Sequence, residues 1–314
     1  MICWLRQGLC KAIKPPPPAT SRLVLSHLHE NRQEFFQRGF LRLRFALLRR
    51  YDKMQIMDRN TQEVSEMKIV SWNCHYGLDS KKFEKIVKDS TFSNADVYAF
   101  QEVLENEFIS ISDFEKGCEY KYRHWYGDHE EYGNCHIPRG AEGDLGIVLI
   151  SKTYKIQRFD QGRIKFRYVV PYILTNGNEK FILIHVWTKS KPDGYIKPII
   201  DALEYYKEQF ENEDIEKIVM LGDFNFGIKF RDERSKKELA TIEEKINKLS
   251  GGLSRSDKFE NCETFRWDKN KEYYFNDCIY TKNITVKDIQ IGNKEDWIES
   301  NLSDHCPVMA ELEI

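Results

Sequence analysis

The chain has 314 residues, of which 41% are hydrophobic and 13% aromatic, a composition sufficient for one large domain or two small ones. Its 48 basic and 50 acidic residues give a net charge of −2, and no apolar run is long enough to span a bilayer. These values exclude a stable membrane-spanning helix and argue against tight, non-specific binding of polyanions.

The eight cysteines occur without Cys-x-x-Cys pairs or zinc-binding spacing. Free thiols in a reducing compartment fit this usage better than a disulfide framework, which predicts a cytoplasmic location. Nothing in the sequence indicates an oligomer, so a monomer is the default expectation.

Residues 1–66 differ in character from the residues that follow. They hold 12 basic and 6 acidic residues, which leaves 36 of the 48 basic and 44 of the 50 acidic residues for 67–314. A polyproline stretch at 15–18 precedes a basic, amphipathic segment at 23–51. The segment is typical of an organelle presequence or of a helix on an anionic membrane surface. The interpretation we favour is a poorly ordered extension or a start codon set too early, with the catalytic domain at 67–314.

From Met67 onward, apolar runs predict strands and three segments with helical spacing predict helices. The predicted helices lie at 79–88, 195–210 and 239–249. The predicted strands lie at 68–72, 96–100, 119–126, 145–151, 166–174, 180–187, 218–221, 263–267, 273–280, 285–291 and 307–314. Strands dominate and no regular βαβ alternation is present. This predicts an α+β fold with two stacked mixed sheets and helices outside.

The apolar run Ile218–Leu221 ends in Gly222, Asp223 and, two places further, Asn225. This pattern predicts a buried strand that stops at a sheet edge. On an extended backbone, residues two apart point the same way, so the carboxylate and the amide are expected side by side. An anionic phosphate attacked by water needs such an acceptor and donor.

Polar residues recur at the ends of the other predicted strands. They are Asn73, Gln101 with Glu102, His185, Asp277, and Asp304 with His305. One such placement is ordinary because Asp and Asn favour turns, and a lone histidine in a strand is usually a core residue. These five placements and that of Asp223 with Asn225 make six, which turn preference explains less easily. Together they predict a common site.

The residue types suit hydrolysis of a phosphoester. Glu102, Asp304 and the amide oxygen of Asn73 are hard oxygen ligands that suit Mg²⁺ or Mn²⁺. Such an ion neutralises phosphate oxygens and stabilises the leaving oxyanion.

The remaining strand-end residues can supply the acid, base and hydrogen-bond donors. Asp277 can orient His305 as a carboxylate–imidazole pair. Asn225 and His185 can donate hydrogen bonds to the transition state, and Asp223 can align or deprotonate the attacking water.

These motifs occur in the order typical of the endonuclease/exonuclease/phosphatase superfamily, which residues 67–314 resemble closely. The motifs are Ser71-Trp-Asn73, Gln101-Glu102-Val103, Ile184-His185, Leu221-Gly-Asp-Phe-Asn225, Phe275-Asn-Asp277 and Ser303-Asp-His305-Cys-Pro307. The general look is that of uncharacterised bacterial or phage-type members.

The resemblance implies a four-layer α/β/β/α sandwich with the site at one sheet edge. It implies metal binding at Glu102 with Asn73 and Asp304 nearby, and His305 paired with Asp277. It also implies phosphate contacts from His185, Asp223 and Asn225. Whether Asp223 or His305 is the base stays open.

The chain departs from some nuclease members at His75, where those members carry an acidic residue two places after the asparagine. Substrate contacts are expected from Arg266, Trp267 and Trp187, which can stack a base, although core packing explains the aromatic residues equally well. Arg167 lies in a basic segment at 152–167 that can hold a phosphate backbone or form a solvated hairpin face.

The function that fits these features is metal-dependent phosphoester hydrolysis of a nucleic acid or nucleotide. A phosphatase or phospholipase-type phosphodiesterase that acts on inositol phosphates or sphingolipids is the first alternative. A catalytically silent scaffold that binds nucleic acid or protein is the second, although the retained Glu102, Asp304 and His305 count against it.

Overall fold

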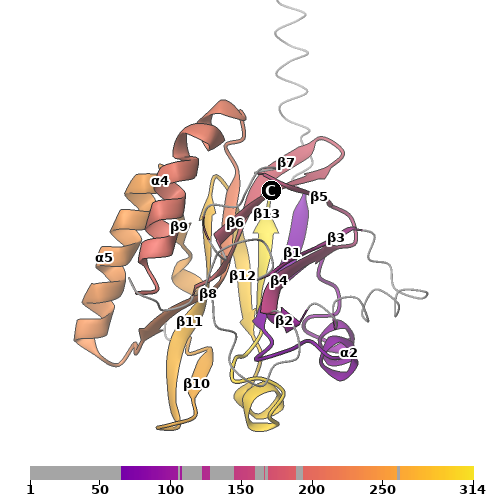
Figure 1. The fold of residues 1–314 in the computed structure, drawn as a ribbon, viewed down its shortest axis with the longest axis vertical. Helices are drawn as coiled ribbons and strands as arrows, with labels where there is room; N and C mark the ends of the chain where they lie inside the picture. The colour runs from indigo at the N-terminus through magenta and orange to yellow at the C-terminus, as the bar shows by residue number, and fades with distance from the viewer. Residues whose placement is uncertain are drawn as a thin grey trace, which may run out of the picture. The chain divides into compact units, whose positions relative to one another are not determined.

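The computed structural model describes residues 65–104, 107, 122–127, 145–159, 166, 169–188, 194–259 and 262–314. For residues 122–127 it describes the backbone only. The described residues belong to one compact unit, Val64–Ile314, drawn in colour in Figure 1. The predicted extension at 1–66 lies outside the described residues except for its last two.

The strands form two sheets, and each sheet is mixed. The six-stranded sheet has the order β12-β13-β1-β2-β4-β3, with β1 parallel to β2. The second sheet has the order β10-β11-β8-β7-β6-β5, with β7 parallel to β8 and β9 paired to β11. The strands of the first sheet are β1 (Glu66–Asn73), β2 (Val97–Leu104), β3 (Tyr122–Gly127), β4 (Leu145–Ser151), β12 (Thr285–Ile291) and β13 (Val308–Glu313). Those of the second are β5 (Lys155–Arg158), β6 (Val169–Asn176), β7 (Glu179–Trp187), β8 (Ile218–Ile228), β9 (Ser254–Arg255), β10 (Phe265–Trp267) and β11 (Glu272–Lys282).

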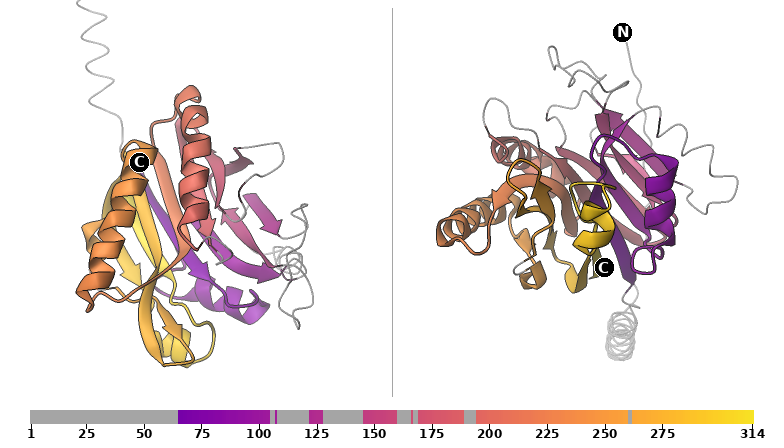
Figure 2. Two further views of the ribbon diagram at one scale, coloured as in Figure 1. Left: turned by 60° about the vertical axis from the view of Figure 1, so that its left-hand side comes forward. Right: turned by 90° about the horizontal axis from the view of Figure 1, so that it is seen from below.

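The helices cover the outer faces of the sheets. Figure 1 shows α4 (Lys197–Asn212) and α5 (Glu233–Ser250) together on one side and α2 (Ser80–Lys88) on the other, and Figure 2 shows the same layers from two further directions. Two short helical turns, η2 (Asp257–Phe259) and η3 (Glu295–Glu299), complete the described elements. No helix among the described residues is long and apolar enough to cross a bilayer.

Capping residues explain where α2 and α5 begin and where α5 ends. The Asp79 side chain accepts a hydrogen bond from the Lys82 backbone N–H at the start of α2, and Asp232 does the same for Arg234 and Ser235 at the start of α5. Helix α5 ends where Gly251 adopts a left-handed conformation (φ 67°).

Both faces of strands β1, β2 and β4 in the first sheet are buried, which explains their near-continuous apolar runs. Along β1, Ile69 packs into the larger core, which also includes the second sheet, α4 and α5, whereas Val70 packs into a smaller core with α2 and Trp297. The two mixed sheets with outer helices confirm the predicted α/β/β/α sandwich.

Most predicted elements agree with the structure, and the largest differences lie at strand and helix boundaries. Strands β4 and β12 match their predicted ranges, whereas α5 begins six residues before the predicted 239. The strand expected to stop at Gly222 continues to Ile228 as β8. The β5 strand is absent from the predicted elements, because its alternating exposure gives it no apolar run.

Candidate active site

The polar strand-end residues converge where strands of the two sheets meet. Asn73 ends β1, and its Nδ2 donates a hydrogen bond of 2.9 Å to Asp223 Oδ2 on β8 of the other sheet. Beside this contact, Gln101 Nε2 of β2 lies 2.7 Å from His185 Nε2 of β7. These buried polar contacts join the two sheets at the site.

The geometry of β8 differs from the extended backbone that the sequence predicts. Asp223 pairs with Asp277 of β11, but the next paired residues are Ile228 and Phe275, so β8 bulges by three residues between them. Asn225 lies in this bulge with a φ of 50°. Its Nδ2 therefore returns to Asp223 and donates a hydrogen bond of 2.7 Å to Oδ2. The Asp223 and Asn225 side chains therefore lie side by side, as predicted. They do so because Asn225 has a left-handed backbone conformation, and not because residues two apart on an extended strand point the same way.

Glu102 occupies a second bulge, in the pairing of β2 with β4 between Gln101 and Val103. Its φ of 59° turns the carboxylate out of the sheet, where it is half-buried. Glu102 Oε1 accepts a hydrogen bond of 3.2 Å from Asn73 Nδ2, and Oε2 accepts one of 3.1 Å from the Tyr76 backbone N–H. A non-glycine residue with positive φ costs free energy, and such strain clusters at functional sites.

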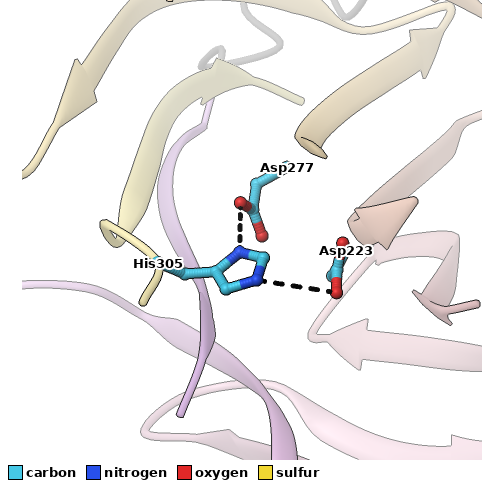
Figure 3. Close-up of side chains that lie close together, drawn as sticks. All are labelled: Asp223, Asp277 and His305. Carbon is cyan, nitrogen blue, oxygen red and sulfur yellow. Dashed lines mark hydrogen bonds and ion pairs between the residues drawn. The ribbon is translucent and has the colours of Figure 1, made fainter. Parts of the chain in front are cut away.

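Asp277, His305 and Asp223 form the buried centre of the site, shown in Figure 3. His305 Nδ1 lies 2.7 Å from Asp277 Oδ2, which confirms the predicted pair in geometry. His305 Nε2 lies 3.9 Å from Asp223 Oδ2 and 3.9 Å from Asp304 Oδ1. The Nε2–H therefore points between two carboxylates without a hydrogen bond of ordinary length to either.

Two contacts of the backbone and one of the ring fix His305. Its N–H donates to Ser303 Oγ at 3.0 Å, and its carbonyl accepts from Trp72 Nε1 at 3.0 Å. The ring of Phe265 lies 4.6 Å from the imidazole, centroid to centroid. These contacts hold the imidazole in one orientation.

The charges of the cluster are mutually dependent. Burial alone would lower the pKa of His305, but the negative charges of Asp277 and Asp223 outweigh it and raise the pKa to about 10. Burial raises the pKa of Asp223 to about 7, with the charge of Asp277 adding to this and His305 opposing it. At neutral pH the imidazole is therefore protonated, and Asp223 can both accept and release a proton.

The raised pKa of His305 makes a prediction about stability in the metal-free protein. Because the folded protein retains a proton on His305 that the unfolded chain loses above pH 6.5, the contribution is complete below pH 6.5 and lost as pH rises through about 10. We expect the free energy of unfolding, measured with urea in EDTA, to fall over this range by up to about 5 kcal/mol. The variant His305→Asn should remove this fall.

His185 provides a matched control for this measurement. Burial lowers the pKa of His185 to about 3, so it stays neutral in the folded protein and contributes no slope between pH 6.5 and 10. His185→Asn should therefore keep the fall in stability seen in the unaltered chain. An equal slope in the unaltered chain and in His305→Asn would contradict the assigned charge of His305.

His185 is fully buried, and this limits its predicted contact with phosphate. Its Nε2 lies against Gln101 Nε2, while its Nδ1 is a buried atom for which the described residues supply no partner. In the neutral form one ring nitrogen is a donor and the other an acceptor. The direct role in phosphate binding stays a prediction, and the structure adds Gln101 as the residue that orients the ring.

Asn73 makes a different contact from the one expected of a metal ligand. Its Oδ1 accepts the His75 backbone N–H at 3.0 Å, and its Nδ2 donates to Glu102 and Asp223. This amide orientation follows from the partners, because the two carboxylates need a donor and the backbone N–H needs an acceptor. Asn73 therefore orients both carboxylates, and its role as a metal ligand stays a prediction because Oδ1 keeps one lone pair.

The donor chemistry fits a divalent cation. Asp304 Oδ1 is a buried carboxylate oxygen with no hydrogen-bond partner among the described residues, and Glu102 adds a second half-buried carboxylate. Within the described part of the chain, the one group of three acidic, histidine or cysteine side chains with donor atoms within 4.8 Å of one another is Asp223, Asp277 and His305. Glu102 and Asp304, which lie outside that group, offer further carboxylate oxygens that could hold a divalent cation.

His75, where the chain departs from some nuclease members, lies in the site. His75 Nδ1 lies 2.9 Å from Asp304 Oδ2, and the hydrogen bond to Asp304 raises the pKa of His75. Although burial opposes it, this hydrogen bond and the nearby histidine charges lower the pKa of Asp304. The signal in the sequence was the position of His75, two residues after Asn73.

The predicted substrate contacts divide into three groups. Trp187 is only 2% exposed and packs in the core, so the prediction that it stacks a base is wrong. Trp267 is 46% exposed at the end of β10, and the neighbouring Arg266 N–H donates to the Asp304 carbonyl at 2.9 Å, which ties β10 to the site. Arg167 lies outside the described residues.

Comparisons with solved structures identify this fold, although no protein-family model and no curated protein sequence matches the chain. The 3′-5′ exonuclease NExo of Neisseria meningitidis is 17% identical, with a TM-score of 0.54 over 79% of this chain and 100% of that one. An endonuclease/exonuclease/phosphatase protein of Bacteroides vulgatus is 16% identical, with a TM-score of 0.53 over 80% of this chain and 99% of that one.

A third structure, D. rerio TDP2 complexed with a single-strand DNA product, is 15% identical, with a TM-score of 0.51 over 80% of this chain and 100% of that one. At these identities the similarity is one of fold. The chain has the fold of the endonuclease/exonuclease/phosphatase superfamily, as the order of its motifs predicts.

Proposed function

We propose that the protein is a divalent-metal-dependent phosphoester hydrolase. The observation that carries this proposal is the continuous hydrogen-bonded set in which Asn73 joins Glu102 to Asp223, beside the buried Asp277–His305 pair. Asp223, whose pKa lies near 7, can act as a base for water that attacks phosphorus. Asp304 Oδ1, which has no hydrogen-bond partner among the described residues, lies in the same site.

In this proposal Asp223 is the general base. Its carboxylate takes a proton from water as the water oxygen bonds to phosphorus and the bond from phosphorus to the leaving oxygen breaks. Its pKa of about 7 lies near neutral pH, whereas the pKa of His305, about 10, leaves that residue without a free lone pair. This difference favours Asp223 over His305, the choice that the sequence left open.

His305 then stabilises charge on the phosphate. Asp277 holds Nδ1, so the Nε2–H is available to donate a hydrogen bond to a phosphoryl oxygen. Asn225 donates from Nδ2 to Asp223 and to the Thr188 carbonyl, and it positions the base. A divalent ion at Glu102, when bound, would neutralise phosphate oxygens and stabilise the leaving oxyanion.

The substrate class we propose is a nucleic acid or nucleotide. Support comes from the neighbours, since NExo is named as an exonuclease and TDP2 was solved with a DNA product. The exposed Trp267 beside the site offers a surface for stacking a base. An inositol-phosphate or sphingolipid phosphodiesterase is the alternative substrate reading, and a silent binding scaffold is the alternative of another class.

A substrate panel tests this proposal. Single- and double-stranded DNA, RNA, bis-p-nitrophenyl phosphate, inositol phosphates and sphingomyelin would each be incubated with Mg²⁺ or Mn²⁺ and with EDTA. We expect turnover of a nucleic acid and of the synthetic diester, complete loss in EDTA, and recovery when the ion is restored. Turnover of the inositol phosphates or sphingomyelin alone would favour the alternative substrate class.

Glu102→Gln is the informative variant in the panel. It keeps the shape of the side chain and removes the charge that we propose for cation binding, so activity should fall by at least about 100-fold. Glu216→Gln, at an exposed residue just before β8, makes the same chemical change away from the site and should leave activity unchanged. Absence of turnover on every substrate, or an active Glu102→Gln, would refute the proposal.

We further propose that residues 67–314 form the catalytic domain and residues 1–66 a separate extension. The described cysteines, Cys74, Cys262, Cys278 and Cys306, are all free thiols. This supports the proposed location in a reducing compartment, namely the cytoplasm. Expressing 67–314 alone and finding lower activity or a changed location would contradict this division.

A further inference from the structure

His75 stands out among the charged and polar residues that line the site, because the proposed chemistry leaves it without a role. Its side chain is 43% exposed, yet the loop that carries it is tightly held. The backbone of His75 donates to Asn73 Oδ1, and Lys82 Nζ binds the carbonyls of Cys74 at 2.5 Å and Gly77 at 2.9 Å. An exposed imidazole on a fixed loop is suited to bind something outside the protein.

The two ring nitrogens of His75 differ in their surroundings. Nδ1 lies 2.9 Å from Asp304 Oδ2, so in the neutral ring the hydrogen bond places the proton on Nδ1 and the lone pair on Nε2. The described residues supply no hydrogen-bond partner for Nε2. A histidine that donates one ring N–H to a carboxylate and leaves the other nitrogen free is the arrangement that orients metal-binding imidazoles.

Glu102, on strand β2, accepts a hydrogen bond from the loop that carries His75. The Tyr76 N–H, one residue from His75, donates to Glu102 Oε2 at 3.1 Å, and the charge of Glu102 acts on the His75 ring. From the residues that the structure describes, each Glu102 oxygen accepts a single hydrogen bond and keeps lone-pair capacity for a cation.

From these contacts we infer that His75 Nε2 is a direct ligand of the divalent cation beside Glu102, with Asp304 as the carboxylate that orients it. This inference rests on the proposed metal-dependent function and narrows its cofactor. A mixed nitrogen and oxygen set binds transition-metal ions such as Mn²⁺ better relative to Mg²⁺ than an all-oxygen set does. The site should therefore select a transition-metal ion over Mg²⁺.

Mn²⁺ bound to the full-length protein gives a readout that does not depend on activity. Pulsed electron paramagnetic resonance should detect coupling of the bound Mn²⁺ to a directly ligated imidazole ¹⁴N. His75→Asn should abolish that coupling and weaken Mn²⁺ binding by about tenfold or more. His305→Asn and His185→Asn are the matched controls and should keep the coupling, because neither residue is a ligand in this inference.

Competition with Mg²⁺ measures the selectivity. His75→Asp replaces the nitrogen ligand with an oxygen ligand, and we expect the ratio of Mn²⁺ to Mg²⁺ affinity to fall about tenfold. An unchanged ratio would overturn the inferred selectivity.

Three results would overturn the inference: no bound Mn²⁺, no ¹⁴N coupling in the unaltered chain, or coupling that persists in His75→Asn and disappears in His305→Asn. The last result would place the cation in the Asp223, Asp277 and His305 group instead. EDTA-sensitive hydrolysis without ¹⁴N coupling would refute the His75 ligand and leave the proposed function standing. Coupling that depends on His75, without turnover of any substrate in the panel, would refute the proposed function alone.

Discussion

Asp223→Asn is expected to lower kcat/KM for the best substrate of the panel by about 10²–10⁴-fold, the usual contribution of a general base. The amide cannot accept a proton from water. It also introduces a donor where Asp223 Oδ1 and Oδ2 accept hydrogen bonds from Asn225 and Asn73. The measurement is steady-state kinetics at saturating Mn²⁺, in which kcat should carry most of the loss.

The exposed Asp214 gives the control for this variant, because Asp214→Asn makes the same change in the turn before β8 and should leave kcat/KM unchanged. Combining Asp223→Asn with His305→Asn should cost less than the product of the two single effects, since both residues act on one phosphate. Retention of activity within about threefold in Asp223→Asn would exclude this residue as the base.

Gly222→Ala is expected to lower the free energy of unfolding by at least about 3 kcal/mol. A Cβ at Gly222 would lie 1.9 Å from the backbone carbonyl oxygen of Val186, which belongs to the adjacent strand β7 and cannot move without breaking the sheet. The φ of 138° is also one that residues with a side chain rarely adopt. Urea denaturation at neutral pH would measure the loss.

Gly177→Ala separates the two causes of that loss. Gly177 also has a positive φ, 57°, in the turn between β6 and β7, but a Cβ there would meet nothing within 4 Å. Its substitution should cost about 1–2 kcal/mol from conformation alone. If Gly222→Ala cost no more than Gly177→Ala, the close approach of β8 to β7 would be absent in solution.

The sequence predicted the fold class and the identities of most site residues because both depend on local patterns. Apolar runs specify strands whichever partner they find, and the pairing of Asp277 with His305 follows from residue chemistry and motif order. Trp187 was misplaced because an aromatic residue beside a site motif has the same pattern whether it faces the core or the solvent, and the structure buries it.

Strand bulges were also invisible in the sequence. Nothing local distinguishes Glu102 or Asn225 from an ordinary strand residue, yet both adopt positive φ values because neighbouring strands impose the register around them. The amide orientation of Asn73 likewise depends on tertiary partners, since Glu102 and Asp223 come from two other strands.

What the sequence by itself determined is therefore the set of chemical groups and the strands that carry them. The tertiary structure decided which atoms face one another. It placed His305 between buried carboxylates, which sets its charge and the pKa of Asp223. It also placed His75 against Asp304, a contact between residues 229 positions apart that no local pattern encodes. Electrostatic coupling depends on distance through space, and only the packed sheets specify that distance.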